Sequence, residues 1–135
     1  MVTKVGFTGT QAGMTPAQAR RLTDFLKADM EFHHGDCIGA DAQGRNLAYA
    51  LGARIIAHPP TDPKKQAGTG YHEAWGPRDY IQRNHDIVDA ADYLIACPQH
   101  MVEELRSGTW ATIRYARKVG KNVIIIYPDG SDSNG

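Results

Sequence analysis

The stretch that decides the fold covers residues 83–128 and reads RNHDIVDAADYLIACPQHMVEELRSGTWATIRYARKVGKNVIIIYP. Residues 93–97 form an apolar run typical of a buried strand, and a helical pattern begins at SGTW. A second apolar run follows at residues 122–127. A strand, a helix and another strand in this order are typical of a parallel sheet. The small residues of SGT therefore stand where a helix begins, after a strand has ended.

The same alternation extends toward the N-terminus. A capping box is predicted at the first helix, with Thr15 as N-cap, Pro16 at the first helical position and Gln18 at the third. Five strands alternating with four helices predict an α/β fold, a Rossmann-like three-layer sandwich with a parallel five-stranded sheet in the order 3-2-1-4-5. We expect the strands at residues 4–8, 31–34, 54–60, 93–97 and 122–127, and the last two helices at 78–91 and 107–119.

The chain is expected to form one domain over residues 1–128, followed by a flexible polar tail at 129–135. Residues 59–77 are rich in Pro and Gly and lack periodicity, so we expect a long loop. Loops of this length in compact domains are commonly lids or binding loops.

Composition excludes several classes of protein. The 135 residues carry 15 Lys and Arg against 15 Asp and Glu, so no overall charge favours nucleic acid or an acidic membrane. No apolar run is long enough for a membrane helix, and the expectation is a cytoplasmic protein without membrane contact. Cys37 and Cys97 are expected to be reduced thiols. His33, His34 and Cys37 lie close together, but neighbouring strand residues point to opposite faces, so no metal site is expected.

Two loops are predicted to hold an anion. The strand order makes the first and fourth strands neighbours, and ligands bind beyond the carboxyl ends of strands at such a switch point. The unpaired N–H groups at a helix N-terminus favour a phosphate there. Glycines that merely make tight turns are the alternative reading of either loop. The residues expected at the ligand are Gly6, Thr8, Gly9 and Thr10 in the first loop, and Pro98, Ser107, Gly108, Thr109 and Thr112 around the second.

Two further segments complete the predicted site. The loop HHGDCIGAD brings Gly35, Asp36, Gly39 and Asp41 beyond the second strand, where an aspartate can bind a ribose or cap the next helix. Arg78, Arg83 and Asn84 lie within two helical turns and can line one edge, because Arg binds phosphate in a bidentate manner.

The ordered motifs GFTGT, HHGDCIGADA, RNHDIVDAADYLIACP and SGTWATIRYARKVGKNVIIIYP resemble the SLOG superfamily of Rossmann-like domains, over residues 6–128. That superfamily includes the LOG enzymes, DprA and the small YspA/YAcAr-type proteins, and the SGTW form is most similar to the last group. The resemblance to LOG enzymes implies hydrolysis of the N-glycosidic bond of nucleoside monophosphates, with Arg83 as the matching arginine. Thr112 and Gln82 stand where the LOG pattern has glutamates, so the expected carboxylate is missing.

The sequence leads to three hypotheses. The first is a binding protein for a nucleotide or nucleotide-derived small molecule. A sensing role fits this hypothesis without any catalysis, and we expect no cofactor and self-association into a homo-oligomer. The second is a nucleotide N-glycosidase in which Arg83 acts with a relocated carboxylate, taken from Asp36, Asp41 or Glu73. The third, implied by DprA, is binding of single-stranded DNA along a basic strip made of Lys64, Lys65, Arg78, Arg83, Arg106, Arg114 and Arg117.

Overall fold

The computed structural model describes residues 2–134 and confirms the alternation of strands and helices. The elements are β1 (Thr3–Gly9), α1 (Pro16–Phe25), β2 (Met30–His34), α2 (Ala40–Ala50), β3 (Arg54–Ala57), a short 3-10 helix η1 (Pro63–Lys65), β4 (Glu73–Ala74), α3 (Tyr80–Ala90), β5 (Tyr93–Cys97), α4 (Gly108–Lys118), β6 (Asn122–Ile126) and β7 (Asp132–Asn134).

The sheet has the order β4-β3-β2-β1-β5-β6-β7. Its central part, β3-β2-β1-β5-β6, is parallel and has the predicted order. The prediction of five strands is corrected to seven. β4, inside the expected long loop, pairs with Ile56 and Ala57 of β3, and β7 pairs antiparallel with β6. The polar tail therefore continues the sheet over residues 132–134, after a turn at Gly130, whose φ is 87°.

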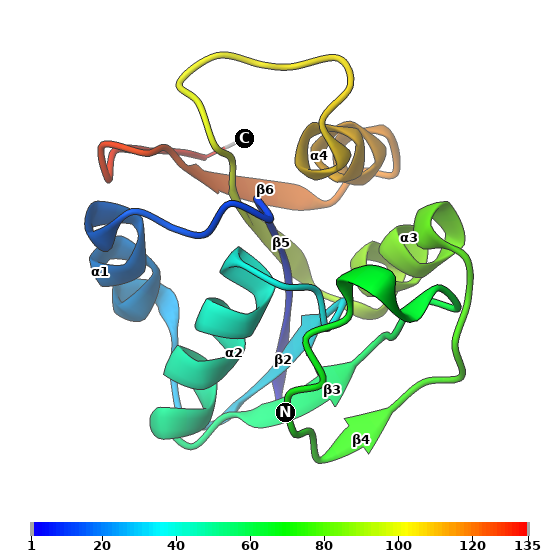
Figure 1. Ribbon diagram of the computed structural model, residues 1–135. Coiled ribbons are helices and arrows are strands. Elements are labelled where there is room, and N and C mark those ends of the chain that lie inside the picture. Colours follow the sequence, from blue (N-terminus) through cyan, green and yellow to red (C-terminus); the bar gives the residue numbers. More distant parts are fainter. Residues whose placement is uncertain (1, 135) are drawn as a thin grey trace.

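The sheet is the middle layer of three. Figure 1 shows α1 and α2 on one face of the sheet and α3 and α4 on the other. Successive strand residues face alternate layers: Ile95 packs in the core under α1 and α2, and Leu94 packs in the core under α3 and α4. The three-layer α/β prediction is confirmed. No helix within residues 2–134 is long and apolar enough to cross a membrane.

Side-chain caps fix where the helices begin. The capping box at α1 is present as predicted, because Thr15 Oγ1 accepts from Gln18 N and Gln18 Oε1 accepts from Thr15 N. Asp79 accepts from Gln82 N, so α3 begins two residues later than expected. Ser107 Oγ accepts from Trp110 N at 3.2 Å and begins α4 at Gly108. The cap at Ser107 places the start of α4 beyond the end of β5.

Candidate functional site

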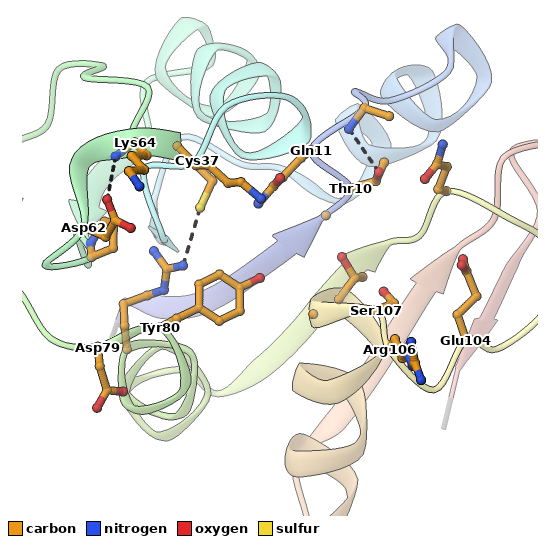
Figure 2. Close-up of a pocket in the computed structure, with 18 of the residues that line it drawn as sticks. Thr10, Gln11, Cys37, Asp62, Lys64, Asp79, Tyr80, Glu104, Arg106 and Ser107 are labelled. Atoms are coloured by element: carbon orange, nitrogen blue, oxygen red, sulfur yellow. Dashed lines mark hydrogen bonds between the residues drawn. The ribbon is translucent and has the colours of Figure 1, made fainter.

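A pocket of about 890 Å³ opens beyond the carboxyl ends of β1 and β5, at the predicted switch point. It is surrounded by the loop after β1, the β2–α2 loop at Cys37, the loop around η1, the start of α3, and the β5–α4 loop with the start of α4 (Figure 2). The lining residues are Gly9, Thr10, Gln11, Ala12, Cys37, Pro60, Thr61, Asp62, Lys64, Lys65, Asp79, Tyr80, Arg83, Gln99, Glu104, Arg106, Ser107, Gly108 and Thr109.

The start of α4 presents free donors to this pocket. Within residues 2–134 no acceptor takes the backbone N–H of Gly108 or Thr109, because the Ser107 cap is bonded to Trp110. Gly108 remains partly exposed, so solvent reaches the helix end. These donors lie at the positive end of the helix dipole. This is the segment for which the sequence predicts an anion site.

The loop after β1 forms the neighbouring wall. Thr10 donates its backbone N–H to Cys97 O at 3.1 Å, and its hydroxyl accepts from Ala12 N at 3.1 Å. These bonds hold the loop against the end of β5. Gly9 and Thr10 line the pocket as predicted, together with Gln11.

The pocket carries more basic side chains than acidic ones. Lys64, Lys65 and Arg106 form no ion pair within the described residues 2–134. Two of the three lining carboxylates have structural roles, since Asp62 caps η1 and Asp79 caps α3. These three basic groups have no carboxylate partner among the described residues of the pocket, and the sequence had placed them in a DNA-binding strip instead. The sequence signal for this wall was the pair Lys64 and Lys65 inside the long Pro- and Gly-rich loop at residues 59–77.

Tyr80, which the sequence analysis did not select, stands in the middle of the pocket. Figure 2 shows its ring between Cys37 on one side and Ser107 on the other. Its ring lies 5.0 Å from the guanidinium carbon of Arg83, a cation–π contact. A Cβ atom added at Gly108 would collide with the Tyr80 hydroxyl, so Gly108 is required for this close approach. Aromatic residues at a helix start gave no distinctive signal in the sequence.

Arg83 lies at the floor of the pocket but is mainly a structural residue. Its side chain is only 2% exposed. Nη1 donates to the carbonyl oxygens of Gly35 and His58, Nε donates to Asn84 Oδ1 at 2.9 Å, and Nη2 donates to Cys37 Sγ at 3.4 Å. The guanidinium therefore joins the ends of β2 and β3 to α3. Four of its five N–H donors are thus bonded within the protein, which leaves one for the phosphate contact that the sequence predicts, although Arg83 does line the pocket.

Asp36 is likewise buried, with 2% exposure, and does not line the pocket. Its Oδ1 accepts from the backbone N and the hydroxyl of Thr69, at 3.1 and 2.9 Å, and its Oδ2 accepts from Gln66 Nε2 at 3.0 Å. Both carboxylate oxygens hold the loop that carries η1, so the structure does not bring Asp36 to the pocket where the sequence predicts ribose-binding and catalytic roles for it.

Asp41 lies beneath the pocket, beside a small cavity that Thr8 and Asn84 also line. Its Oδ2 accepts from Gly35 N at 2.9 Å and from Cys37 N at 3.4 Å. Burial raises the pKa of Asp41 to about 6, against the opposing effect of the nearby Arg83 charge. The three residues are near the predicted site, but they face this cavity and not the main pocket.

Three predicted glycines serve packing instead of ligand contact. A Cβ at Gly6 would press on Ile87 and Ala91 of α3, and one at Gly35 would collide with the Arg83 guanidinium. Gly39 has a φ of 84°, and a Cβ there would strike the Gln11 backbone. The sequence correctly marked close approaches at these positions, but the approaching groups belong to the protein.

Four other predicted residues lie outside the pocket. Glu73 is exposed in β4 and pairs with Arg54 at 3.4 Å, and Arg78 pairs with Asp86 at 2.9 Å. The carbonyl oxygen of Pro98 accepts from Gln18 Nε2 at 2.8 Å. Thr112 is buried and donates its hydroxyl to Gly108 O at 2.9 Å. The structure therefore does not bring these four predicted residues together with the lining of the pocket.

A buried histidine network lies on the β2–β3 side of the pocket floor. His33 Nδ1 lies 2.9 Å from His58 Nε2, and His33 Nε2 lies 3.1 Å from Glu31 Oε1. Burial lowers the pKa of His34 to about 4 and that of His58 to about 3, so both are neutral near pH 7. Within residues 2–134 no group of three His, Cys, Asp or Glu side chains has metal-site geometry.

No family model and no curated protein matches the sequence. Solved structures do match its fold. A molybdenum cofactor binding protein from Rippkaea orientalis is 20% identical with a TM-score of 0.72, covering 94% of this chain and 77% of that one.

Two further structures give the same result. The X-ray structure of the protein TM1055 is 16% identical with a TM-score of 0.66, covering 90% of this chain and 72% of that one. The molybdenum cofactor carrier protein from Chlamydomonas reinhardtii is 18% identical with a TM-score of 0.64, covering 93% and 76%. At such identities the likeness establishes the Rossmann-like α/β fold of this chain.

Proposed function

We propose that this protein binds an anionic small molecule, a nucleotide or a nucleotide-like cofactor, in the pocket at the start of α4. One observation carries the proposal: the unpaired N–H groups of Gly108 and Thr109 open into the same 890 Å³ space as unpaired basic side chains. A phosphate at the helix end would satisfy those donors. Its charge would be balanced by Arg106 and the Lys64–Lys65 pair. The resemblance to the SLOG superfamily favours the same class of ligand.

A second candidate ligand is the molybdenum cofactor. Two of the similar structures are proteins that bind or carry this cofactor. The fit to this chain rests on the anion: the cofactor bears a phosphate group, for which the start of α4 and the Lys64–Lys65 pair offer donors. Ser107 and Thr109 would hold that phosphate, and the bound cofactor itself would supply the redox chemistry of its metal.

The glycosidase hypothesis has less support from the geometry. Of the three carboxylates considered for a relocated catalytic role, Asp36 and Glu73 are bonded away from the pocket. Asp41 alone lies close to it, in the floor. Base release from a nucleoside monophosphate, lost in Asp41→Asn, is the result that would restore this hypothesis.

The DNA hypothesis also loses its basis in a continuous strip. Arg83 is buried, Arg78 pairs with Asp86, and Arg114 pairs with Glu103 at 2.8 Å. The unpaired members of the set that line the pocket are Lys64, Lys65 and Arg106.

Calorimetric titration tests the proposal. ADP, AMP, ADP-ribose, cyclic nucleotides and the molybdenum cofactor are each titrated into the wild-type protein and into Arg106→Ala. We expect one ligand of this panel to bind, and Arg106→Ala to weaken it about tenfold, because a charge-assisted hydrogen bond contributes about 1.5–3 kcal/mol. The matched control is Arg117→Ala, an exposed arginine in the last turn of the same helix, which should bind like the wild type. Absence of binding by the whole panel at millimolar concentration would refute the proposal.

A further inference from the structure

The loop that carries Lys64 and Lys65 is held to the β2–α2 loop mainly by Asp36. Asp36 uses its carboxylate and its carbonyl for this purpose. Its Oδ1 accepts from Thr69, its Oδ2 accepts from Gln66, and its carbonyl oxygen accepts from Ala67 N at 2.8 Å. Four hydrogen bonds therefore converge on a side chain and backbone that are almost completely buried.

Asp36 is itself held firmly. Its backbone N–H donates to His34 Nδ1 at 3.0 Å, and its φ of 53° is in the left-handed region that Asp tolerates better than most residues. The neighbouring backbone adds a second connection, since Ile38 N donates to Lys65 O at 3.0 Å. The β2–α2 loop and the segment 64–69 thus form one bonded unit, whose outer side contributes Lys64 and Lys65 to the pocket.

We propose that Asp36 is a positioning residue for ligand binding: its carboxylate fixes the Lys64–Lys65 segment on the pocket wall and thereby increases affinity for an anionic ligand that Asp36 never touches. The inference rests on the proposed function and identifies the residue that positions one wall of that site. It also predicts that neutralising Asp36 weakens anion binding, whereas simple electrostatics predicts that it tightens binding. A negative carboxylate near a cationic pocket repels an anion, so its neutralisation alone would tighten binding.

The exchange Asp36→Asn separates the two effects. The bulk of the side chain is kept, but the acceptor of the two Thr69 bonds loses its charge, and the Asn Nδ2 group meets the Gln66 Nε2 donor unless that amide rotates. We expect about tenfold weaker binding of whichever panel ligand the wild type takes up. The double variant Asp36→Asn with Gln66→Glu restores a donor–acceptor pair at unchanged total charge, and affinity should recover.

Two measurements show whether the loss passes through the lysines. In the background Lys64→Ala with Lys65→Ala, adding Asp36→Asn should weaken binding by less than twofold, because the group it positions is gone. The backbone N–H of Thr69 donates to Asp36, so its hydrogen exchange should accelerate in Asp36→Asn. The exchange rate should return to that of the wild type in the double variant Asp36→Asn with Gln66→Glu. Thr69→Val, which removes the hydroxyl bond alone, provides a milder second disruption with the same direction.

The outcomes are distinguishable. If the wild type binds and Asp36→Asn binds equally well or more tightly, the inference is overturned while the proposed function stands. Losses that multiply in the lysine-free background, or affinity that does not recover in the double variant Asp36→Asn with Gln66→Glu, would also overturn it. If the wild type binds no member of the panel, the proposed function and this inference fail together.

Discussion

The two sides of the pocket are built in different ways. On the α4 side, Ser107 caps the helix, the backbone donors of Gly108 and Thr109 have no acceptor among residues 2–134, and Gly108 is partly exposed. On the β2–β3 side, the charged groups Asp36, Asp41 and Arg83 are buried and bonded to one another's loops. The difference shows that charged residues in a site-like motif can be scaffold, while small residues beside them face the ligand.

Among substitutions on the β2–β3 side, removal of Arg83 should have the largest effect on stability. Arg83→Ala leaves the carbonyls of Gly35 and His58 without their donor and opens a large cavity. We expect the free energy of unfolding to fall by about 3–5 kcal/mol, measured by urea denaturation at pH 7. Loss of ligand binding with unchanged stability would instead make Arg83 a ligand-contacting residue and remove the contrast between the two sides.

Gly39 tests the close approach between the β2–α2 loop and the loop after β1. Gly39→Ala forces a methyl group onto the Gln11 backbone at a φ of 84°. A loss of about 1–3 kcal/mol in the free energy of unfolding is expected from the strain. The matched control is Gly120→Ala, which has a similar φ of 83° but no atom within 4 Å, so it should cost less. Equal losses in the two variants would contradict the role of the contact.

The buried histidines of the β2–β3 side make the stability of the protein sensitive to acid. Burial lowers the pKa of His58 from 6.5 to about 3, so the stability that the neutral imidazole contributes is complete above pH 6.5 and is lost as the pH falls toward 3. At pH 5 the cost is about 2 kcal/mol for His58.

His58→Gln removes this titration. Between pH 7 and pH 5 the wild type should therefore lose about 2 kcal/mol more unfolding free energy than the variant. Denaturation curves at the two pH values measure the difference. Parallel losses in both proteins would show that His58 is not neutral in the folded state.

Thr112 should give the smallest effect. Thr112→Val removes one hydrogen bond to Gly108 O and keeps the shape of the side chain. The expected loss of stability is about 1 kcal/mol, with ligand affinity within twofold of the wild type. A calorimetric titration that shows a large loss of affinity would return Thr112 to the site.

The sequence was sufficient to predict the central sheet and the start of α4, because both depend on local signals. Apolar runs with helical segments between them define the order of the strands, and Ser107 before a helical pattern is a recognisable N-cap. β4 and β7 were missed because two or three polar residues pair with strand edges through their backbones, which leaves no pattern of side chains.

The partners of charged side chains were harder to predict. Asp36 and Glu73 carry the same functional group, and only the fold shows that Asp36 accepts from Thr69 while Glu73 pairs with the exposed Arg54. Tyr80 and the Lys64–Lys65 pair reach the pocket through a long loop and the helix after it, whose path depends on tertiary contacts such as those of Asp36.

The most direct test of the account is a nuclear magnetic resonance titration with inorganic pyrophosphate, which carries charge but no base. The amide resonances of Gly108 and Thr109 should move most, and those of the exposed C-terminal turn of α4 should stay in place. Resonances that move only around Glu73, or that do not move at all with millimolar pyrophosphate, would contradict an anion site at the start of α4.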